Sequence, residues 1–253
     1  MRVMLTGFSG WLGRFLAPRL RQEGHVVVGL DVVAGEATDV IGSVADRSVI
    51  DKVFADHSIE AVIHAGALHK PDIVRFPPQA FVDANVSGTL NLLQAAVAAG
   101  HDRFVMTSTT SLMISQAIRD GDGHAAVWLD ETTGPLEPRN IYGVTLERAS
   151  GFEIFVISAP TPFARDDVAT LKSDAADVIA RYFPEAPALF ARRSWHLPKT
   201  IGRIYDPGKA ERLLGFRART DFAAVLRALR AGVPLPFAHD PDYVSPSTRL
   251  ANG

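Results

Sequence analysis

The feature that most constrains the fold of this chain is a set of three glycines directly after a short apolar run. The run Arg2–Thr6 (RVMLT) predicts a buried strand, and the overlapping segment TGFSGWLG spaces Gly7, Gly10 and Gly13 evenly. The apolar spacing of Trp11–Glu23 predicts a helix that begins inside this loop. Glycines between a strand and a helix let backbone N–H groups approach a pyrophosphate at the positive end of the helix. The loop therefore predicts an α/β fold with an anion site.

Strands and helices alternate in the pattern of the first half of the chain. Short β-branched runs predict strands that are buried on both faces, and longer apolar periodicities between them predict helices. The expected strands are His25–Asp31, Ala61–Ala65 and Arg103–Ser108, and the expected helices are Asp46–Asp56 and Pro77–Ala99. Strands separated by helices imply right-handed βαβ units. We therefore expect an α/β fold with a doubly wound parallel sheet.

The pattern is looser after Ser108 and predicts a smaller second part. The segment 115–139 is rich in glycine and proline and predicts a loop. The elements expected beyond it are a short helix at Tyr142–Ser150, a strand at Phe152–Ser158, and helices at Arg165–Phe183, Lys209–Leu214 and Asp221–Arg230. We expect two domains, 1–150 and 151–253, of which the second is a reduced C-terminal lobe.

Asp31 stands at the end of the second expected strand. This position is close to the offset of about 20 residues at which an acidic side chain binds the ribose of a dinucleotide. The carboxylate would accept hydrogen bonds from the ribose hydroxyls and repel a 2′-phosphate. No Arg or Lys occurs from Asp31 to Ala37. The sequence therefore predicts NAD rather than NADP as the cofactor.

Composition excludes several classes of protein. The 253 residues contain no cysteine, which excludes a disulfide scaffold, a thiolate metal site and a cysteine nucleophile. The net charge of −2 gives no basic field for nucleic acid, and no apolar run is long enough to span a membrane. His64 and His69 lie close together in sequence, but no carboxylate completes a metal set. We expect no metal, and a cytoplasmic location because no secretory signal pattern occurs.

Several segments together resemble the extended short-chain dehydrogenases/reductases, which include the NAD-dependent nucleotide-sugar epimerases and dehydratases. The spacing of TGFSGWLG matches this group, and the similarity continues through residues 1–146. The other similar segments are IGSVAD at Ile41–Asp46, VIHAGA at Val62–Ala67, NVSGTL at Asn85–Leu90, TSTT at Thr107–Thr110 and PRNIY at Pro138–Tyr142. The resemblance implies a Rossmann sheet, an NAD cofactor, and hydride chemistry at a carbon of a sugar or nucleotide-sugar.

The resemblance also implies roles for individual residues. Tyr142 would be the base that takes a hydroxyl proton while NAD takes the hydride. Thr109, with Ser108 as a near alternative, would hydrogen-bond the same oxygen, and Asn85 matches the asparagine of the family's catalytic set. The residues implied to bind the cofactor are Gly7, Phe8, Ser9, Gly10, Trp11, Leu12, Gly13, Asp31, Ser43, Val44, His64, Ala65, Gly66, Ala67 and Thr107.

The chain departs from the family just after Tyr142. Leu146 stands where the family has a lysine that lowers the pKa of the tyrosine, and leucine cannot do this. Residues 146–150 then run directly into Gly151–Ser158, so a block that holds much of the substrate pocket is missing. We expect Phe152–Ser158 to fill the vacated sheet position beside Arg103–Ser108.

These departures leave two hypotheses about function. The first is an NAD-dependent epimerase or dehydratase of sugars or nucleotide-sugars that is impaired by the loss of the lysine. The second is an NAD-binding protein without efficient turnover, which serves as a cofactor sensor or an interaction module. Restoring a lysine at position 146 separates them, because only an otherwise intact site gains turnover.

Candidate substrate contacts lie in the basic C-terminal half. The segment Arg181–Arg230 carries 11 Lys and Arg against 4 Asp and Glu, which indicates either solvated helix faces or a cationic wall for a diphosphate. The candidates are Arg192, Arg193 and Arg203, because guanidinium groups bind phosphate oxygens in pairs. The resemblance further implies a homodimer that packs through the helix Pro77–Ala99.

Overall fold

The computed structural model describes residues 1–35, 38–121, 123–133 and 153–236. The chain divides into two compact units, the first containing Met1–Thr109 and the second containing the described residues 110–133 and 153–236. Tyr142, Leu146 and the helix expected at Tyr142–Ser150 lie outside the described residues. The domain boundary expected at residue 150 lies there too, and it stays a prediction.

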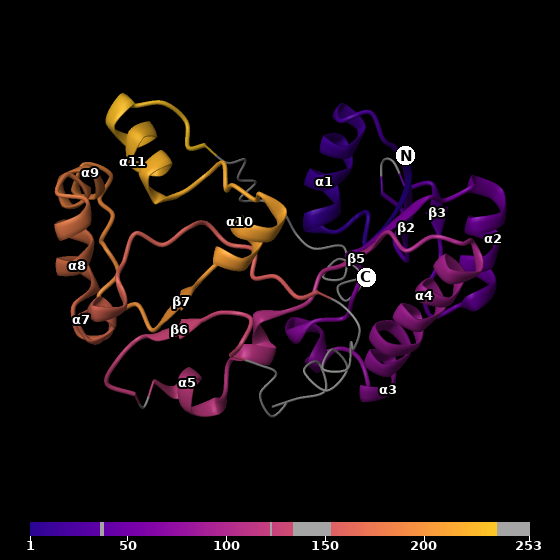
Figure 1. The fold of residues 1–253 in the computed structure, drawn as a ribbon, viewed down its shortest axis with the longest axis horizontal. Helices are drawn as coiled ribbons and strands as arrows, with labels where there is room; N and C mark the ends of the chain where they lie inside the picture. The colour runs from indigo at the N-terminus through magenta and orange to yellow at the C-terminus, as the bar shows by residue number, and fades with distance from the viewer. Residues whose placement is uncertain (36–37, 122, 134–152, 237–253) are drawn as a thin grey trace. The chain divides into compact units, whose positions relative to one another are not determined.

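Five parallel strands form the sheet of the first unit. They are β1 (Arg2–Thr6), β2 (Val26–Asp31), β3 (Val40–Ile41), β4 (Ala61–His64) and β5 (Phe104–Met106). Their spatial order is β3-β2-β1-β4-β5, and β1 pairs with both β2 and β4 (Figure 1). The order reverses beside β1, and at such a switch point the loops after the strands open a crevice for ligands. The parallel, doubly wound sheet expected from the sequence is confirmed.

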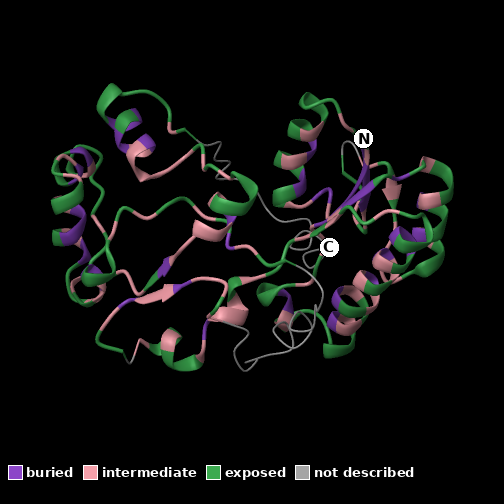
Figure 2. Ribbon diagram, viewed as in Figure 1, coloured by how far each residue is buried: buried purple, intermediate pink, exposed green. Residues whose placement is uncertain are grey.

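Helices cover both faces of this sheet, because successive strand residues point to opposite sides. Leu5 of β1 packs in one core cluster with Ala17, and its neighbour Met4 packs in another with Leu92 on the opposite face. Helix α1 (Trp11–Gln22) covers the first face, and helices α2 (Arg47–His57) and α4 (Gly88–Ala98) cover the second (Figure 1). Burial of both faces explains the apolar strands, and Figure 2 shows the buried residues gathered on them.

The long helix expected at Pro77–Ala99 is divided into three segments. They are α3 (Pro78–Phe81), a π-helical segment (Val82–Ser87) and α4, and a 3₁₀ turn (Lys70–Val74) precedes them. Within the π-helical segment, the carbonyl of Asn85 accepts a hydrogen bond from the hydroxyl of Thr89 at 2.7 Å. Segments of this kind occur frequently at functional sites.

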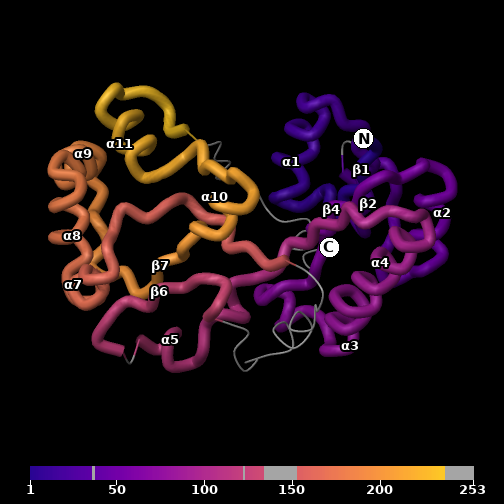
Figure 3. The backbone as a smooth tube through the Cα atoms, viewed as in Figure 1, coloured from indigo at the N-terminus to yellow at the C-terminus, as the bar shows by residue number. Residues whose placement is uncertain are grey.

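The second unit contains short helices and a small parallel sheet. β6 (Val127–Leu129) and β7 (Arg203–Tyr205) pair with Trp128 opposite Ile204, and Figure 3 shows the two strands side by side. The helices are α5 (Gln116–Asp120), α7 (Val168–Ser173), α8 (Ala175–Tyr182), α9 (Ala186–Ala191), α10 (Gly208–Leu214) and α11 (Phe222–Ala231), with 3₁₀ turns at Thr110–Met113 and Arg165–Asp167. The two helices expected nearest the C-terminus are confirmed as α10 and α11.

Two elements expected in this unit are corrected by the structure. Residues 153–158 form neither helix nor strand, so Phe152–Ser158 does not extend the sheet beside β5. The backbone N–H of Val156 instead donates to the Glu131 carboxylate at 2.7 Å, and the Ser158 hydroxyl donates to the Tyr205 carbonyl at 3.2 Å. The helix expected at Arg165–Phe183 is broken, because Asp174 ends α7 and caps the first turn of α8.

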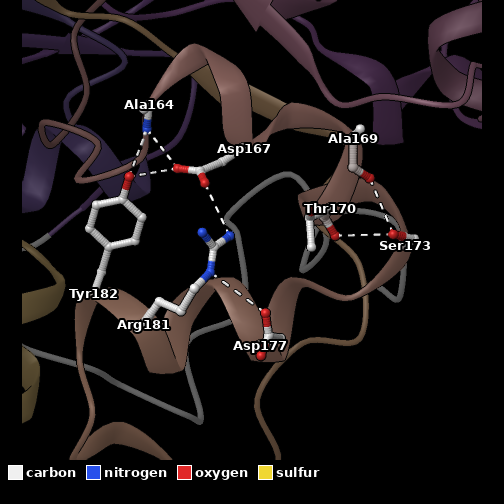
Figure 4. A network of polar contacts seen from close by, with 8 residues as sticks. All are labelled: Ala164, Asp167, Ala169, Thr170, Ser173, Asp177, Arg181 and Tyr182. Atoms are coloured by element: carbon white, nitrogen blue, oxygen red, sulfur yellow. Dashed lines mark hydrogen bonds and ion pairs between the residues drawn. The ribbon is translucent and has the colours of Figure 1, made fainter.

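A buried carboxylate stabilises the second unit at the start of this broken helix. Asp167 accepts hydrogen bonds from the Tyr182 hydroxyl at 2.6 Å, the Ala164 N–H at 2.9 Å and the Arg181 guanidinium at 3.1 Å (Figure 4). The hydrogen bond from Tyr182 is the largest cause that lowers the pKa of Asp167, and the same bond raises the pKa of Tyr182. This network joins the turn before α7 to the end of α8.

Candidate cofactor site

A pocket of about 540 Å³ opens at the carboxyl edge of the sheet in the first unit. Most of its walls come from the segments that follow β1, β2, β3 and β4, at the switch point of the strand order. The volume is within the usual range for cofactor and small-molecule sites. The lining residues are Thr6, Gly7, Gly10, Trp11, Leu12, Leu30, Asp31, Val32, Val33, Gly42, Ser43, Val44, Ala65, Gly66, Ala67, Leu68, His69, Asp72, Phe76 and Ala84.

The glycine loop lies against the loop after β4. Gly7 has φ +67°, and a Cβ at this residue would lie 2.7 Å from the backbone nitrogen of Gly66. A side chain would therefore force the two loops apart and fill the space that a ligand needs. Gly10 is the N-cap residue of α1 and makes no side-chain cap. The first N–H groups of this helix are therefore oriented as in an anion site.

Asp31 connects the end of β2 to the glycine loop. Its carboxylate accepts a hydrogen bond from the Ser9 N–H at 2.9 Å and another from the Val33 N–H at 3.0 Å. Each carboxylate oxygen has two lone-pair sites, so the group can still accept hydrogen bonds from hydroxyls in the pocket. No Arg or Lys occurs among the described residues that line the pocket. The site therefore suits a ribose with free hydroxyls better than one that carries a 2′-phosphate.

Most of the residues expected to bind the cofactor line this pocket. Five of the expected residues do not line it. Phe8 is buried in the core with Leu5, and the Ser9 hydroxyl donates to the Val33 carbonyl. His64 is buried below the pocket, and the Thr107 N–H donates to its carbonyl at 3.0 Å. Gly13 lies under the glycine loop, where a Cβ would overlap the carbonyls of Gly7 and Phe8.

The residues expected to be catalytic are distributed differently. Thr107, Ser108 and Thr109 follow the end of β5, on the same sheet edge as the pocket. Asn85 is 3% exposed, and its side-chain amide accepts from the N–H of Leu68 and donates to the carbonyl of Leu68, both at 2.9 Å. The amide thus holds the pocket wall. Tyr142 is outside the described residues.

Sequence reasoning missed an acidic residue at the pocket. Asp72 is 1% exposed, accepts a hydrogen bond from the His69 N–H at 2.9 Å, and lies 3.7 Å from the Arg75 guanidinium. The signal was the spacing His-Lys-Pro-Asp, because an acidic residue in the first turn after a proline caps a short helix. Phe76 and Ala84, which also line the pocket, carry no comparable signal.

The arginines expected to contact a diphosphate are in the second unit. Arg192 and Arg193 follow α9, and Arg203 begins β7. All three side chains are exposed. Within the described residues, no group of His, Asp and Glu side chains is arranged to hold a metal ion. In the same part of the chain, no helix is both long and apolar enough to cross a membrane.

The glycine loop, Asp31 and the strand order define a dinucleotide-binding α/β unit, and comparison with known proteins identifies its family. The chain belongs to the NAD dependent epimerase/dehydratase family, whose model matches residues 3–146. The resemblance to extended short-chain dehydrogenases/reductases is thereby confirmed. NAD, the expected cofactor, is the cofactor of this family.

Relatives and solved structures show what the chain is similar to. A UDP-glucose 4-epimerase from Rhizobium leguminosarum bv. trifolii is 31% identical over 208 residues, which cover 78% of this chain and 57% of that protein. A UDP-glucose 4-epimerase from Klebsiella pneumoniae is 33% identical over 127 residues, covering 44% of this chain and 91% of that sequence.

Among solved structures, a short-chain dehydrogenase/reductase superfamily protein from Agrobacterium tumefaciens with bound NAD aligns with a TM-score of 0.47 and 28% identity. That alignment covers 58% of this chain and 42% of the other. The Thermus thermophilus UDP-glucose 4-epimerase complex with NAD gives a TM-score of 0.48 and 24% identity, over 58% of this chain and 48% of the other. The chain thus spans about half the length of these solved proteins.

Proposed function

We propose that the first unit binds NAD and that the protein is an NAD-dependent oxidoreductase of the epimerase/dehydratase type, acting on a sugar or nucleotide-sugar. The observation that carries the proposal is the placement of Asp31 and the glycine loop around one pocket without Arg or Lys in its described lining. An acid that binds the loop and faces the pocket is suited to the ribose of NAD and opposes that of NADP.

Different residues of this protein would bind different parts of the cofactor. The N–H groups at the start of α1 and the loop from Gly7 to Gly10 would bind the pyrophosphate, because the helix dipole favours negative charge there. Asp31 would accept the ribose hydroxyls, and the wall from Ala65 to Leu68 would lie along the cofactor. When bound, NAD supplies an acceptor for hydride from a carbinol carbon.

The relatives and the sequence support the proposed substrate class. Both curated relatives named above are UDP-glucose 4-epimerases, which supports a UDP-sugar as the first substrate to test. Tyr142 would take the hydroxyl proton, and Thr109 or Ser108 would hydrogen-bond the same oxygen. Arg192, Arg193 and Arg203 are the candidates that would bind the diphosphate. The homodimer implied by the family is part of this proposal.

A second function is favoured by one sequence observation, Leu146 in the place of a lysine. A leucine at this position would not lower the pKa of the Tyr142 phenol as the family's lysine does, and proton abstraction near neutral pH would be inefficient. The protein would then bind NAD without efficient turnover. Cofactor binding is common to both functions, and only turnover separates them.

Calorimetry with NAD and NADP tests the shared part of the proposal on the full chain. We expect NAD to bind more tightly, and tighter binding of NADP would contradict the role of Asp31. Turnover is tested with UDP-glucose and UDP-galactose on the wild type and on Leu146→Lys. A gain of turnover in Leu146→Lys supports the enzyme, whereas no gain with NAD still bound supports the second function.

A further inference from the structure

A continuous chain of hydrogen bonds runs beneath the cofactor pocket. Thr6 Oγ1 lies 3.1 Å from the Gly66 nitrogen and 2.6 Å from Nδ1 of His64. On the other side of the ring, Nε2 lies 3.1 Å from Thr89 Oγ1, which in turn lies 2.7 Å from the carbonyl oxygen of Asn85. His64 is 3% exposed and Thr6 is 1% exposed, so water does not replace these partners.

The donor and acceptor of each hydrogen bond in this network follow from the groups at its two ends. The carbonyl of Asn85 can only accept, so the hydroxyl proton of Thr89 is donated to it. Thr89 Oγ1 must then accept from His64, which places the ring proton on Nε2. Burial lowers the pKa of His64 to about 4, so near pH 7 the ring carries only this proton.

The hydrogen bonds on the Nδ1 side of the His64 ring have the same donor-to-acceptor direction. Nδ1 of His64 has no proton and accepts from the hydroxyl of Thr6. Thr6 Oγ1 keeps a lone pair for the N–H of Gly66. The donors therefore run from Gly66 through Thr6, His64 and Thr89 to Asn85, and the ring of His64 is the one member that joins the two halves.

Both ends of this chain hold the same wall of the pocket. The wall is the segment from Ala65 to Leu68, which lies at the end of β4. Gly66 is fixed by Thr6, and a Cβ on Gly66 would lie 2.9 Å from the Gly7 nitrogen. Leu68 is fixed through its N–H and its carbonyl by the Asn85 side chain. A change at His64 therefore reaches the glycine loop and Asn85 together.

We propose that His64, fixed as the Nε2–H tautomer, is a positioning residue that couples the glycine loop to Asn85 and sets the wall Ala65–Leu68 for the cofactor. The ring does not line the pocket, so it acts through Thr6 and Thr89 rather than by contact with NAD. The inference rests on the proposed function only in taking the pocket as an NAD site. In the neutral ring, the hydrogen bonds to Thr6 and Thr89 specify which nitrogen carries the proton.

Long-range ¹H–¹⁵N NMR of the full chain, labelled at histidine, tests the tautomer directly. The signal set that disappears in His64→Gln identifies His64 among the 8 histidines. At pH 7 we expect a protonated Nε2 and a bare Nδ1. A ring protonated at Nδ1, or at both nitrogens, would overturn the proposal. This measurement uses the folded wild type without NAD, so it remains decisive if the protein fails to bind NAD and the proposed function fails.

A matched set of variants tests the coupling. Thr89→Val removes the hydroxyl between His64 and Asn85, and Thr89→Ser restores it. Because two buried groups lose their partner, NAD affinity measured by calorimetry should fall roughly 10-fold in Thr89→Val, with a changed His64 ring signal, and return to near the wild-type value in Thr89→Ser. Thr170→Val, on α7 of the second unit, is the control and should leave both readouts unchanged.

Two further variants test the hydrogen bonds on the two sides of the His64 ring separately. His64→Asn places an amide oxygen near Nδ1 and keeps an acceptor for Thr6, whereas His64→Gln places an amide nitrogen near Nε2 and keeps a donor for Thr89. Each should weaken NAD binding, because each breaks one half. NAD affinity equal to that of the wild type in Thr89→Val and in both His64 variants would overturn the coupling. Weakening in Thr89→Val that Thr89→Ser does not restore would also contradict it.

Discussion

The carboxylate of Asp31 accepts a hydrogen bond from the backbone N–H of Ser9, with 2.9 Å between Oδ2 and the nitrogen. The acid at the end of β2 therefore orders the glycine loop before any ligand is bound. Its second oxygen accepts from the N–H of Val33, so the carboxylate is fixed in orientation from two sides. A preorganised acceptor loses little conformational entropy when a ribose binds.

This relationship predicts the effect of replacing Asp31. Asp31→Asn removes the charge and turns an NH₂ group toward one of two backbone N–H donors, which disturbs the loop as well as the ribose site. We expect NAD affinity to fall roughly 10- to 100-fold, since charge-assisted hydrogen bonds are the stronger kind, and discrimination against NADP to shrink. Calorimetry with both cofactors measures the two effects.

The control for this prediction is Asp51→Asn. Asp51 is exposed on α2, where it pairs with Arg47 at 2.7 Å, and exposed pairs of this kind contribute little to stability. This variant should bind both cofactors like the wild type. Equal NAD affinity in Asp31→Asn and Asp51→Asn would remove Asp31 from the cofactor site.

Gly7 predicts a separate effect of backbone geometry. In Gly7→Ala the methyl group would lie 2.7 Å from the Gly66 nitrogen, in addition to the strain of φ +67°. We expect loss of measurable NAD binding, and a loss of stability larger than the 1–2 kcal/mol or so that a left-handed backbone alone costs an L-residue. Calorimetry and urea unfolding measure these two quantities.

Gly100 supplies the matched control for the backbone strain. It has φ +77° after α4, and a Cβ there would meet nothing within 4 Å. Gly100→Ala should therefore lose stability from the backbone alone, by about 1 kcal/mol, and bind NAD normally. If Gly7→Ala binds NAD as Gly100→Ala does, the close approach of the two loops is not needed for the site.

The sequence predicted the part of the fold that local pattern determines. β1, β2 and β4 are apolar runs that are largely buried, and the apolar run of β5 was also predicted although Val105 is 58% exposed. The motif around Gly7 is specific for a dinucleotide-binding loop when a strand precedes it and a helix follows. The short β3 was missed because two residues, Val40 and Ile41, are too few to show a period. The π-helical segment at Asn85 was missed because Pro77–Ala99 was predicted as one continuous helix and no residue pattern marks the change in backbone hydrogen bonding.

The segment Phe152–Ser158 shows why the rest could not be predicted. Its apolar residues are typical of a strand, but a strand forms only where an adjacent strand pairs with it through backbone hydrogen bonds. Here the Val156 N–H bonds to a glutamate side chain, and Ile154 and Ile157 remain exposed. The site shows the same limit: Phe76 lines the pocket just after the 3₁₀ turn Lys70–Val74, and no sequence signal places its side chain there.

The pKa of His64 predicts a pH dependence of stability. Burial lowers this pKa from 6.5 to about 4, so between these values the unfolded chain binds a proton that the folded protein does not. The contribution of the neutral ring is therefore complete above pH 6.5 and is lost as the pH falls toward 4. The shift corresponds to about 3 kcal/mol at the acid limit.

Urea unfolding from pH 7 to pH 4.5 measures this contribution. Other groups titrate in the same range, so the quantity of interest is the difference in unfolding free energy between the wild type and His64→Gln. The wild type should be more stable at pH 7, and its advantage should shrink with acid. A constant difference across the range would show that His64 has an ordinary pKa in the folded protein.

The contacts of Tyr182 predict the stability of the second unit. Its hydroxyl donates to Asp167 at 2.6 Å and accepts from the Ala164 N–H at 3.2 Å, while its ring packs edge-on against Phe163. Tyr182→Phe keeps the ring contact and removes both hydrogen bonds, so the Tm of this unit should fall by a few degrees. Asp177→Asn is the control, because it weakens the 3.6 Å pair with Arg181 between exposed groups and leaves the hydrogen bonds of Tyr182 in place, so the Tm should change little. Equal Tm values for the two variants, measured by calorimetric scanning, would show that the Asp167 network does not join the start of α7 to the end of α8.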